Sequence, residues 1–146
     1  QEVGSEFDVV FESSEGRLIG EAEGKDAKAI NVDKLRQLAM NLHEDLQREE
    51  VTLPAKGVLF GNPYRLSHPT ERTESPFTEK CVAAAASNGT ALVETRQLFV
   101  AAQYMIRAKD NEYAAKWRSA ILTGIGLLSL PAPPVDGEES MSPAEQ

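Results

Sequence analysis

The chain has 146 residues, of which 41% are hydrophobic and 26% are charged, and its formal net charge at pH 7 is −8. This composition is typical of one globular domain with a real core. No stretch approaches the roughly 20 consecutive apolar residues of a transmembrane helix, and no signal-peptide pattern opens the chain, so we expect no membrane partner. The negative charge argues against indiscriminate binding to nucleic acid, which depends on Lys and Arg.

The sequence contains one cysteine, Cys81, and two histidines, His43 and His68. A single cysteine cannot form an internal disulfide and fits the reducing cytoplasm, which is the location that we predict. The spacing of these three residues is not that of zinc ligands, so a structural zinc site is not expected.

Two strand-like segments stand near the start of the chain, at about 7–12 and 18–25. In both segments the side chains alternate with the period of two that is expected of β-strands. A short polar stretch separates them. The pattern therefore predicts a β-hairpin.

The length of the turn decides which residue lies opposite Asp8. A two-residue turn at positions 14–15 pairs Asp8 with Glu21, and a turn one residue later pairs it with Glu23. A three-residue turn pairs Asp8 with Ala22 instead, unless a bulge restores the register. Both two-residue turns bring two carboxylates together.

Carboxylates that face each other across a hairpin repel, and a cation, a proton or solvent relieves the repulsion. Oxygen ligands suit Mg²⁺ or Mn²⁺, and magnesium needs only one or two protein carboxylates besides water and substrate phosphate. Asp8 and Glu21 could meet that demand by themselves, which leaves Glu23 and Lys25 for chemistry. The alternative is a solvated acidic hairpin without a site.

The rest of the chain alternates between helices and strands. A helix is predicted with Asn31 as its N-cap and Asp33 in its first turn. Its apolar stripe consists of Val32, Leu35, Ala39, Leu42 and Leu46. The helix at 96–108 is expected to turn Leu98, Ala101, Ala102, Met105 and Ile106 inward. The other predicted elements are strands at 55–61, 90–94 and 127–130 and helices at 79–87 and 111–123.

The order of these elements around the acidic residues resembles the PD-(D/E)XK nuclease superfamily of restriction-endonuclease-like domains over residues 7 to about 95. Asp8 matches the first acidic residue, and Glu21-Ala22-Glu23 matches the acidic-x-lysine triplet, with glutamate where lysine is usual. Some restriction enzymes of the superfamily have such an acidic-x-acidic variant, and Lys25 lies two residues later on the same strand face. The resemblance implies an α/β restriction-endonuclease-like sandwich, with a mixed central sheet flanked by helices.

The resemblance also implies a function, namely hydrolysis of phosphodiester bonds in nucleic acid, with DNA as the favoured substrate and Mg²⁺ or Mn²⁺ as the cofactor. The implied metal ligands are Asp8, Glu21 and Glu23, and these residues together with Lys25 form the implied catalytic set. Further candidates for substrate binding are Lys34, Gln37, Arg65 and Arg72. Two alternatives stay open, which are a catalytically degenerate domain that binds protein or nucleic acid and a domain that binds a small nucleotide.

The first helix and strand of the superfamily core are not visible in the sequence. We therefore expect residues 1–130 to be a nuclease-like domain or fragment that follows an upstream domain of the same parent protein, compatible with a homodimer. Residues 131–146 contain three prolines by residue 134 and four acidic residues without a basic one. This composition predicts a disordered acidic tail.

Overall fold

A hairpin of two antiparallel strands, β1 (Val9–Ser13) and β2 (Gly16–Gly24), begins the part of the chain that the computed structural model describes, residues 8–135. It is followed by α1 (Asp33–Leu46), β3 (Lys56–Asn62), a short 3₁₀ helix at Pro69–Glu71, α2 (Glu79–Asn88) and β4 (Ala91–Glu94). The last elements are α3 (Thr95–Ala108), α4 (Asn111–Thr123) and β5 (Gly126–Leu127).

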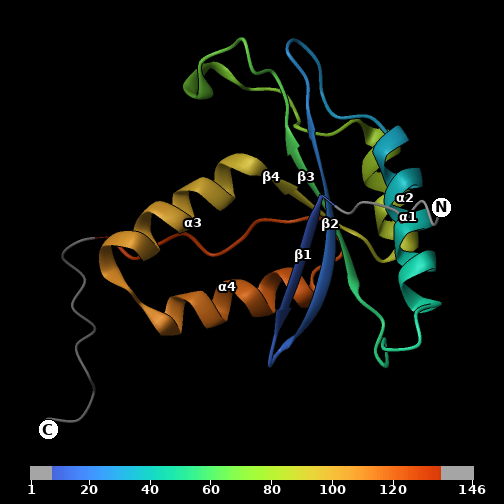
Figure 1. Ribbon diagram of the computed structural model, residues 1–146. Helices are drawn as coiled ribbons and strands as arrows, with labels where there is room; N and C mark the ends of the chain where they lie inside the picture. The colour runs from blue at the N-terminus through green and yellow to red at the C-terminus, as the bar shows by residue number, and fades with distance from the viewer. Residues whose placement is uncertain (1–7, 136–146) are drawn as a thin grey trace, which may run out of the picture.

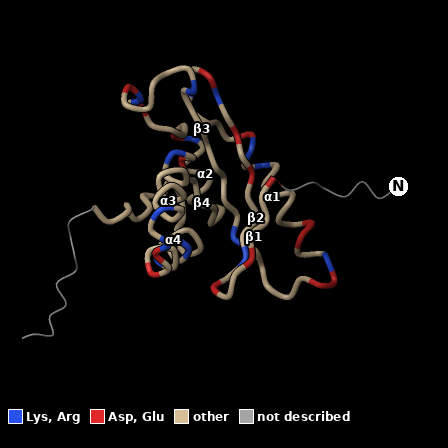
Figure 2. Tube along the Cα trace, turned by 60° about the vertical axis from the view of Figure 1, so that its left-hand side comes forward, with Lys and Arg blue, Asp and Glu red and all other residues tan. Residues whose placement is uncertain are grey.

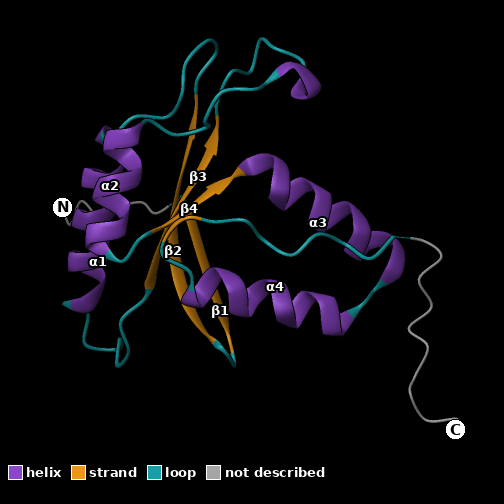
Figure 3. Ribbon diagram, turned by 180° about the vertical axis from the view of Figure 1, so that it is seen from behind, coloured by secondary structure: helices purple, strands orange, loops and turns teal. Residues whose placement is uncertain are grey.

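The five strands form one mixed sheet in the order β1-β2-β3-β4-β5. Only the β1–β2 pair is antiparallel, and the other three pairs are parallel. Helices α1 and α2 lie on one face of the sheet, and α3 and α4 lie on the other (Figure 1; Figure 3, seen from behind). Helical connections are the usual way to join neighbouring parallel strands. The predicted α/β architecture with a mixed sheet between helices is confirmed at this level.

The hairpin adopts the first of the three registers that the sequence left open. Val9 pairs with Gly20 and Ser13 with Gly16, which leaves a two-residue turn at positions 14–15. In this turn the Ser13 hydroxyl accepts a hydrogen bond from the Glu15 amide at 3.2 Å. Continuing the register by one residue puts Asp8 opposite Glu21.

Apolar residues fill the space on both faces of the sheet. Under α1 and α2 the core consists of Ile19, Ile30, Leu35, Leu38, Leu59, Phe77, Cys81, Ala85 and Leu92. On the opposite face a second core contains Leu18, Val58, Phe60, Ala91, Val93, Ile121 and Leu130. The alternation along β2 and β3 therefore places odd-numbered residues of both strands on the α1 face. Glu21 and Glu23 belong to that set.

Helix α1 is rotated about its axis relative to the prediction. Its buried residues are Leu35, Leu38, Asn41 and Asp45. The prediction that Ala39 and Leu46 face the core is wrong, because both are exposed. The physical reason lies across the interface on β2, where partly buried Arg17 and buried Glu21 bond to the polar residues of this helix face.

Helix α3 also differs from the expected packing. Only Ala101 is buried, whereas Leu98, Ala102 and Ile106 are exposed. The α3–α4 pair extends away from the sheet from the ends of the strands, so most of the α3 apolar face does not reach the sheet (Figure 1). Helix α2 follows the prediction more closely, since it ends at Gly89, whose φ of 68° lies in the left-handed region that favours glycine.

The C-terminal part of the described chain is packed beyond the expected boundary at residue 130. Strand β5 has only two residues instead of the predicted 127–130 segment, and the Tyr113 hydroxyl donates a hydrogen bond to the Pro131 carbonyl at 2.8 Å. Residues 131–135 therefore lie within the described structure. The remainder of the expected tail, 136–146, lies outside the described residues. None of the described helices is long and apolar enough to cross a membrane.

The loops that follow β2 and β3 run side by side beyond the ends of their strands. The Lys25 amide bonds to the Asn62 carbonyl at 3.0 Å, and the Arg65 amide bonds to the Lys25 carbonyl at 2.9 Å. Farther along, Ile30 forms a parallel bridge with Phe77, and both side chains are buried. These loops carry basic and acidic residues next to the C-terminal edge of the parallel strands (Figure 2).

Candidate functional site

The candidate site lies where β2 approaches the C-terminal edge of the sheet, on the face covered by α1. Its central residue is Glu21, whose side chain has no exposed surface. One carboxylate oxygen, Oε1, accepts a hydrogen bond from the amide group of Asn41 on α1. The other oxygen, Oε2, is buried and has no hydrogen-bond partner. Lys34 Nζ, also on α1, is 4.0 Å from Oε2.

Asp8 completes the pair of carboxyl groups across the hairpin. Its Oδ2 accepts a hydrogen bond from the Ala22 backbone amide at 3.0 Å, which fixes the aspartate beside Glu21. This amide bond is the main reason why the pKa of Asp8 is lowered. The pKa of Glu21 is raised to about 7, mainly by burial and in addition by the adjacent Asp8 carboxyl group. Glu21 therefore holds its proton to higher pH than an isolated glutamate, while Asp8 ionises first.

Glu23 and Lys25 lie next along the same strand face. Lys25 Nζ is 3.1 Å from Glu23 Oε1, while Glu23 Oε2 is buried without a hydrogen-bond partner. The pKa of the Cys81 thiol is raised to about 11, chiefly by burial and in smaller part by the nearby charge of Glu23. The expected position of Lys25 near the acidic triplet is thus observed, with Glu23 as its ion-pair partner.

The α1 side of the site contains one predicted pair and one residue that sequence reasoning missed. Lys34 and Gln37 were candidates for substrate binding; Lys34 Nζ bonds to Gln37 Oε1 at 3.1 Å, and of the two only Lys34 approaches Glu21. The missed residue is Asn41, because the predicted stripe left it outside the buried face. Its spacing of three from Leu38 was the available signal.

The two arginines predicted to bind substrate are engaged within the loops. Arg65 donates from Nε and Nη2 to Asp26 Oδ1 at 3.0 and 2.6 Å. Arg72 donates to the Ser67 carbonyl at 3.1 Å and to Asn62 Oδ1 at 3.3 Å. These bonds pair both arginines with groups of the loops themselves, and none of them reaches the carboxylates of the site.

The donor set fits a small hard cation that needs few protein ligands. Within residues 8–135 no three His, Cys, Asp or Glu side chains converge as a metal-binding group, so the expected trio of Asp8, Glu21 and Glu23 is not assembled. Asp8 and Glu21 do lie together, and one buried oxygen of Glu21 and one of Glu23 have no hydrogen-bond partner among the described residues. Two carboxylates meet the demand of Mg²⁺ or Mn²⁺, whose remaining positions take water and phosphate.

Comparison of the chain with protein-family models, with curated proteins and with solved structures found no match. The functional interpretation therefore depends on the geometry described above.

Proposed function

We propose that the chain is a metal-dependent phosphodiesterase domain of the PD-(D/E)XK nuclease type, with a nuclease-like sandwich fold and nucleic acid, in particular DNA, as its substrate. The observation that carries the proposal is the fully buried Glu21 opposite Asp8, with an oxygen that no described group hydrogen-bonds. A structural glutamate would be expected to have both oxygens paired, because an unpaired buried charge is destabilising.

Each residue at the site has a role in this proposal. Asp8 and Glu21 would hold Mg²⁺ or Mn²⁺, and Asn41 fixes the orientation of Glu21 through Oε1, so that Oε2 stays available. Glu23 Oε2 would accept a proton from the attacking water. Lys34 and Lys25 supply positive charge on the same face, where negative charge develops on the phosphate oxygens.

The reaction is in-line displacement at phosphorus. A water oxygen forms the new bond to phosphorus, the bond to the leaving sugar oxygen breaks, and that oxygen takes a proton from solvent, so the products are a phosphate monoester and an alcohol. When bound, a divalent cation would polarise the nonbridging oxygens and lower the pKa of the nucleophilic water. Glu23 stands where the triplet usually has lysine. Lys25 and Lys34 would therefore supply the positive charge that this lysine provides.

A second candidate function, a noncatalytic binding domain, is favoured by one specific observation. Lys34 and Asn41 already neutralise and orient part of Glu21, and the raised pKa allows the carboxyl group to stay protonated without any metal. In that case the acidic pair is a structural remnant. The nuclease requires both bound cations and cleavage of DNA, whereas the binding domain requires neither.

The test combines metal binding with cleavage. Millimolar Mn²⁺ or Mg²⁺ should raise the melting temperature of the protein at pH 7.5, because a ligand of the native state stabilises it by mass action. Mn²⁺ should also support nicking of supercoiled DNA. Glu21→Gln and Asp8→Asn should abolish both effects, whereas Glu12→Gln, which removes an exposed carboxylate of the same hairpin, should change neither.

Three outcomes would decide against the nuclease. A melting temperature indifferent to both metals would remove the cation site. A metal-dependent shift without nicking would favour the binding domain. Equal nicking by wild type and both carboxylate variants would indicate a contaminating nuclease and would also favour the binding domain.

A further inference from the structure

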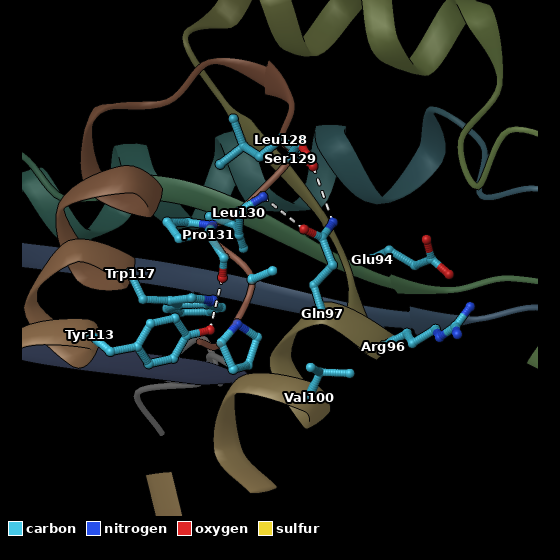
Figure 4. A pocket seen from close by; sticks show the side chains of 12 residues that line it. Glu94, Arg96, Gln97, Val100, Tyr113, Trp117, Leu128, Ser129, Leu130 and Pro131 are labelled. Atoms are coloured by element: carbon cyan, nitrogen blue, oxygen red, sulfur yellow. Dashed lines mark hydrogen bonds between the residues drawn. The ribbon is translucent and has the colours of Figure 1, made fainter. Parts of the chain in front are cut away.

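A cavity of about 340 Å³ lies at the end of β4, on the α3–α4 face of the sheet, apart from the acidic site. Its walls come from the start of α3, from α4 and from the segment that follows β5 (Figure 4). Gln97 fixes that segment by donating to the Leu128 carbonyl at 3.1 Å and accepting from the Leu130 amide at 2.8 Å. Tyr113 adds its hydrogen bond to Pro131. The cavity therefore has hydrogen-bonded walls of defined position.

One lining group has no hydrogen-bond partner among the described residues. The indole nitrogen of Trp117, Nε1, is buried and unpaired. Figure 4 shows this nitrogen turned toward Pro131 and Gln97. The nearby polar groups bond elsewhere, since Gln97 bonds the backbone with both ends of its amide and the Pro131 carbonyl accepts from Tyr113. A donor that is buried without an acceptor indicates an acceptor-bearing ligand or water.

The register of the sheet relates the cavity to the acidic site. Glu23 pairs with Gly61, and Gly61 pairs with Glu94, which lines the cavity. Two strand spacings correspond to about 10 Å across the sheet. The cavity and the carboxylates thus share the C-terminal edge of the parallel strands, on opposite faces. One short stretch of nucleic acid strand that crosses this edge would reach both.

We propose that this cavity binds an unstacked nucleobase of the nucleic acid strand that is cleaved at the acidic site; the inference rests on the proposed function. The chemistry matches a base in three respects. Val100, Trp117 and Pro133 provide an apolar and aromatic wall for a planar ring. The Trp117 N–H can donate to a base carbonyl or ring nitrogen, and exposed Arg96 at the lining can meet a phosphate. The preferred substrate is therefore single-stranded or locally unpaired.

The single tryptophan of the chain makes the proposal measurable. The full chain is titrated in EDTA with oligothymidylate of eight nucleotides, and Trp117 fluorescence is recorded. Saturable quenching is expected, and an octamer of abasic deoxyribose phosphate should bind at least tenfold more weakly. Because metal is absent and nothing is cleaved, failure of the nuclease chemistry does not affect this readout.

Variants then locate the binding. Val100→Phe fills the cavity and should weaken binding at least tenfold, while Ile106→Phe, the matched enlargement at an exposed α3 position outside the cavity, should leave it unchanged. Arg96→Gln, at an exposed position whose side chain also donates to the Pro69 carbonyl at 3.3 Å, should weaken binding several-fold and serves if Val100→Phe is unstable. Glu21→Gln should bind normally.

Three results would overturn the inference. These are absence of quenching, equal affinity for the abasic octamer, and binding that is insensitive to both Val100→Phe and Arg96→Gln. Quenching that survives those two variants would place the ligand in the apolar groove on the other side of Trp117, between α3, α4 and the sheet. Nicking together with equal abasic binding would retain the nuclease and reject the base site.

Discussion

Two buried acidic groups of the described structure, Asp45 on α1 and Glu21 on β2, lie at the interface between these elements and differ in their partners. At the first, Asp45 near the end of α1 accepts hydrogen bonds from both terminal nitrogens of Arg17 on β2, one of them at 2.6 Å. The second is Glu21, four residues after Arg17 on the same face of β2. Its carboxylate accepts a hydrogen bond from the neutral amide group of Asn41, and Lys34 Nζ lies 4.0 Å away. The side chains of both acids have no exposed surface.

The difference appears directly in the acidities. The Arg17 guanidinium lowers the pKa of Asp45, whereas burial and Asp8 raise the pKa of Glu21 to about 7. A bidentate arginine satisfies a carboxylate within the protein, so the Asp45 end of the interface is complete. The Glu21 end lacks an equivalent cation. This asymmetry on one helix–strand interface is the argument for structure at one end and function at the other.

The largest effect on stability is expected at the Asp45 end of the interface, where Arg17 pairs with the buried acid. Arg17→Met should lower the free energy of unfolding by about 3–5 kcal/mol, because it leaves buried Asp45 without its cation. The double variant Arg17→Met/Asp45→Leu should recover most of that loss. Urea unfolding at pH 7 measures both. A single-variant loss below about 1 kcal/mol would show that water or another group can replace the guanidinium.

The next largest effect concerns the pH dependence of the incomplete end. Since the pKa of Glu21 is raised from 4.5 to about 7, the folded state binds more protons than the unfolded state in this interval. The stability of metal-free protein should therefore fall as pH rises from about 4.5 to about 7, by at most about 3 kcal/mol. Glu21→Gln should remove this fall and be more stable than wild type at pH 8.

Urea unfolding in EDTA between pH 4.5 and 8 provides the measurement, read as the difference between Glu21→Gln and wild type. The difference cancels the contribution of Asp45, whose lowered pKa gives the opposite slope at more acidic pH. Parallel curves for the two proteins would refute the protonated Glu21. Glu12→Gln should retain the wild-type slope.

A smaller effect tests whether Lys34 belongs to the site. Its charge favours the ionised form of Glu21, so Lys34→Met should move the fall in stability to higher pH. At pH 7 the change in unfolding free energy should stay within about 1 kcal/mol, because Lys34 is partly exposed. Arg36→Met, at an exposed position of the same helix, is the matched control. Identical pH profiles for both variants would separate Lys34 from the carboxylates.

The hairpin and the alternation of helices and strands could be predicted from sequence because their signals are local. The period of two along β1 and β2 and the left-handed glycine after α2 depend on neighbouring residues alone. The register of Asp8 was restricted to three alternatives, since turn length is not written in the pattern of the strands. Only the structure selects Glu21.

The polar partners on α1 could not be predicted for a related reason. Periodicity assigns apolar residues to the buried face, so the predicted stripe includes Ala39 and Leu46 and leaves out Asn41 and Asp45. The actual rotation depends on Arg17 and Glu21, which are far away in sequence and meet α1 only in the fold. Likewise, the α3 side chains were assumed to face a sheet that this helix mostly does not cover.

The smallest effect is expected at the second partner of Arg17. Arg17 Nε also bonds to Glu12 at 2.8 Å, but the Glu12 side chain is 70% exposed, whereas that of Asp45 is fully buried. Glu12→Gln should therefore lower the free energy of unfolding by no more than about 0.5 kcal/mol, and 0.5 M NaCl should reduce even that difference, because solvent and salt screen exposed pairs. Urea unfolding at two salt concentrations measures it. A salt-independent loss above about 1 kcal/mol would mean that Arg17 needs both acids for its position. The satisfied end of the interface would then consist of Arg17, Asp45 and Glu12, in contrast to the unsatisfied Glu21.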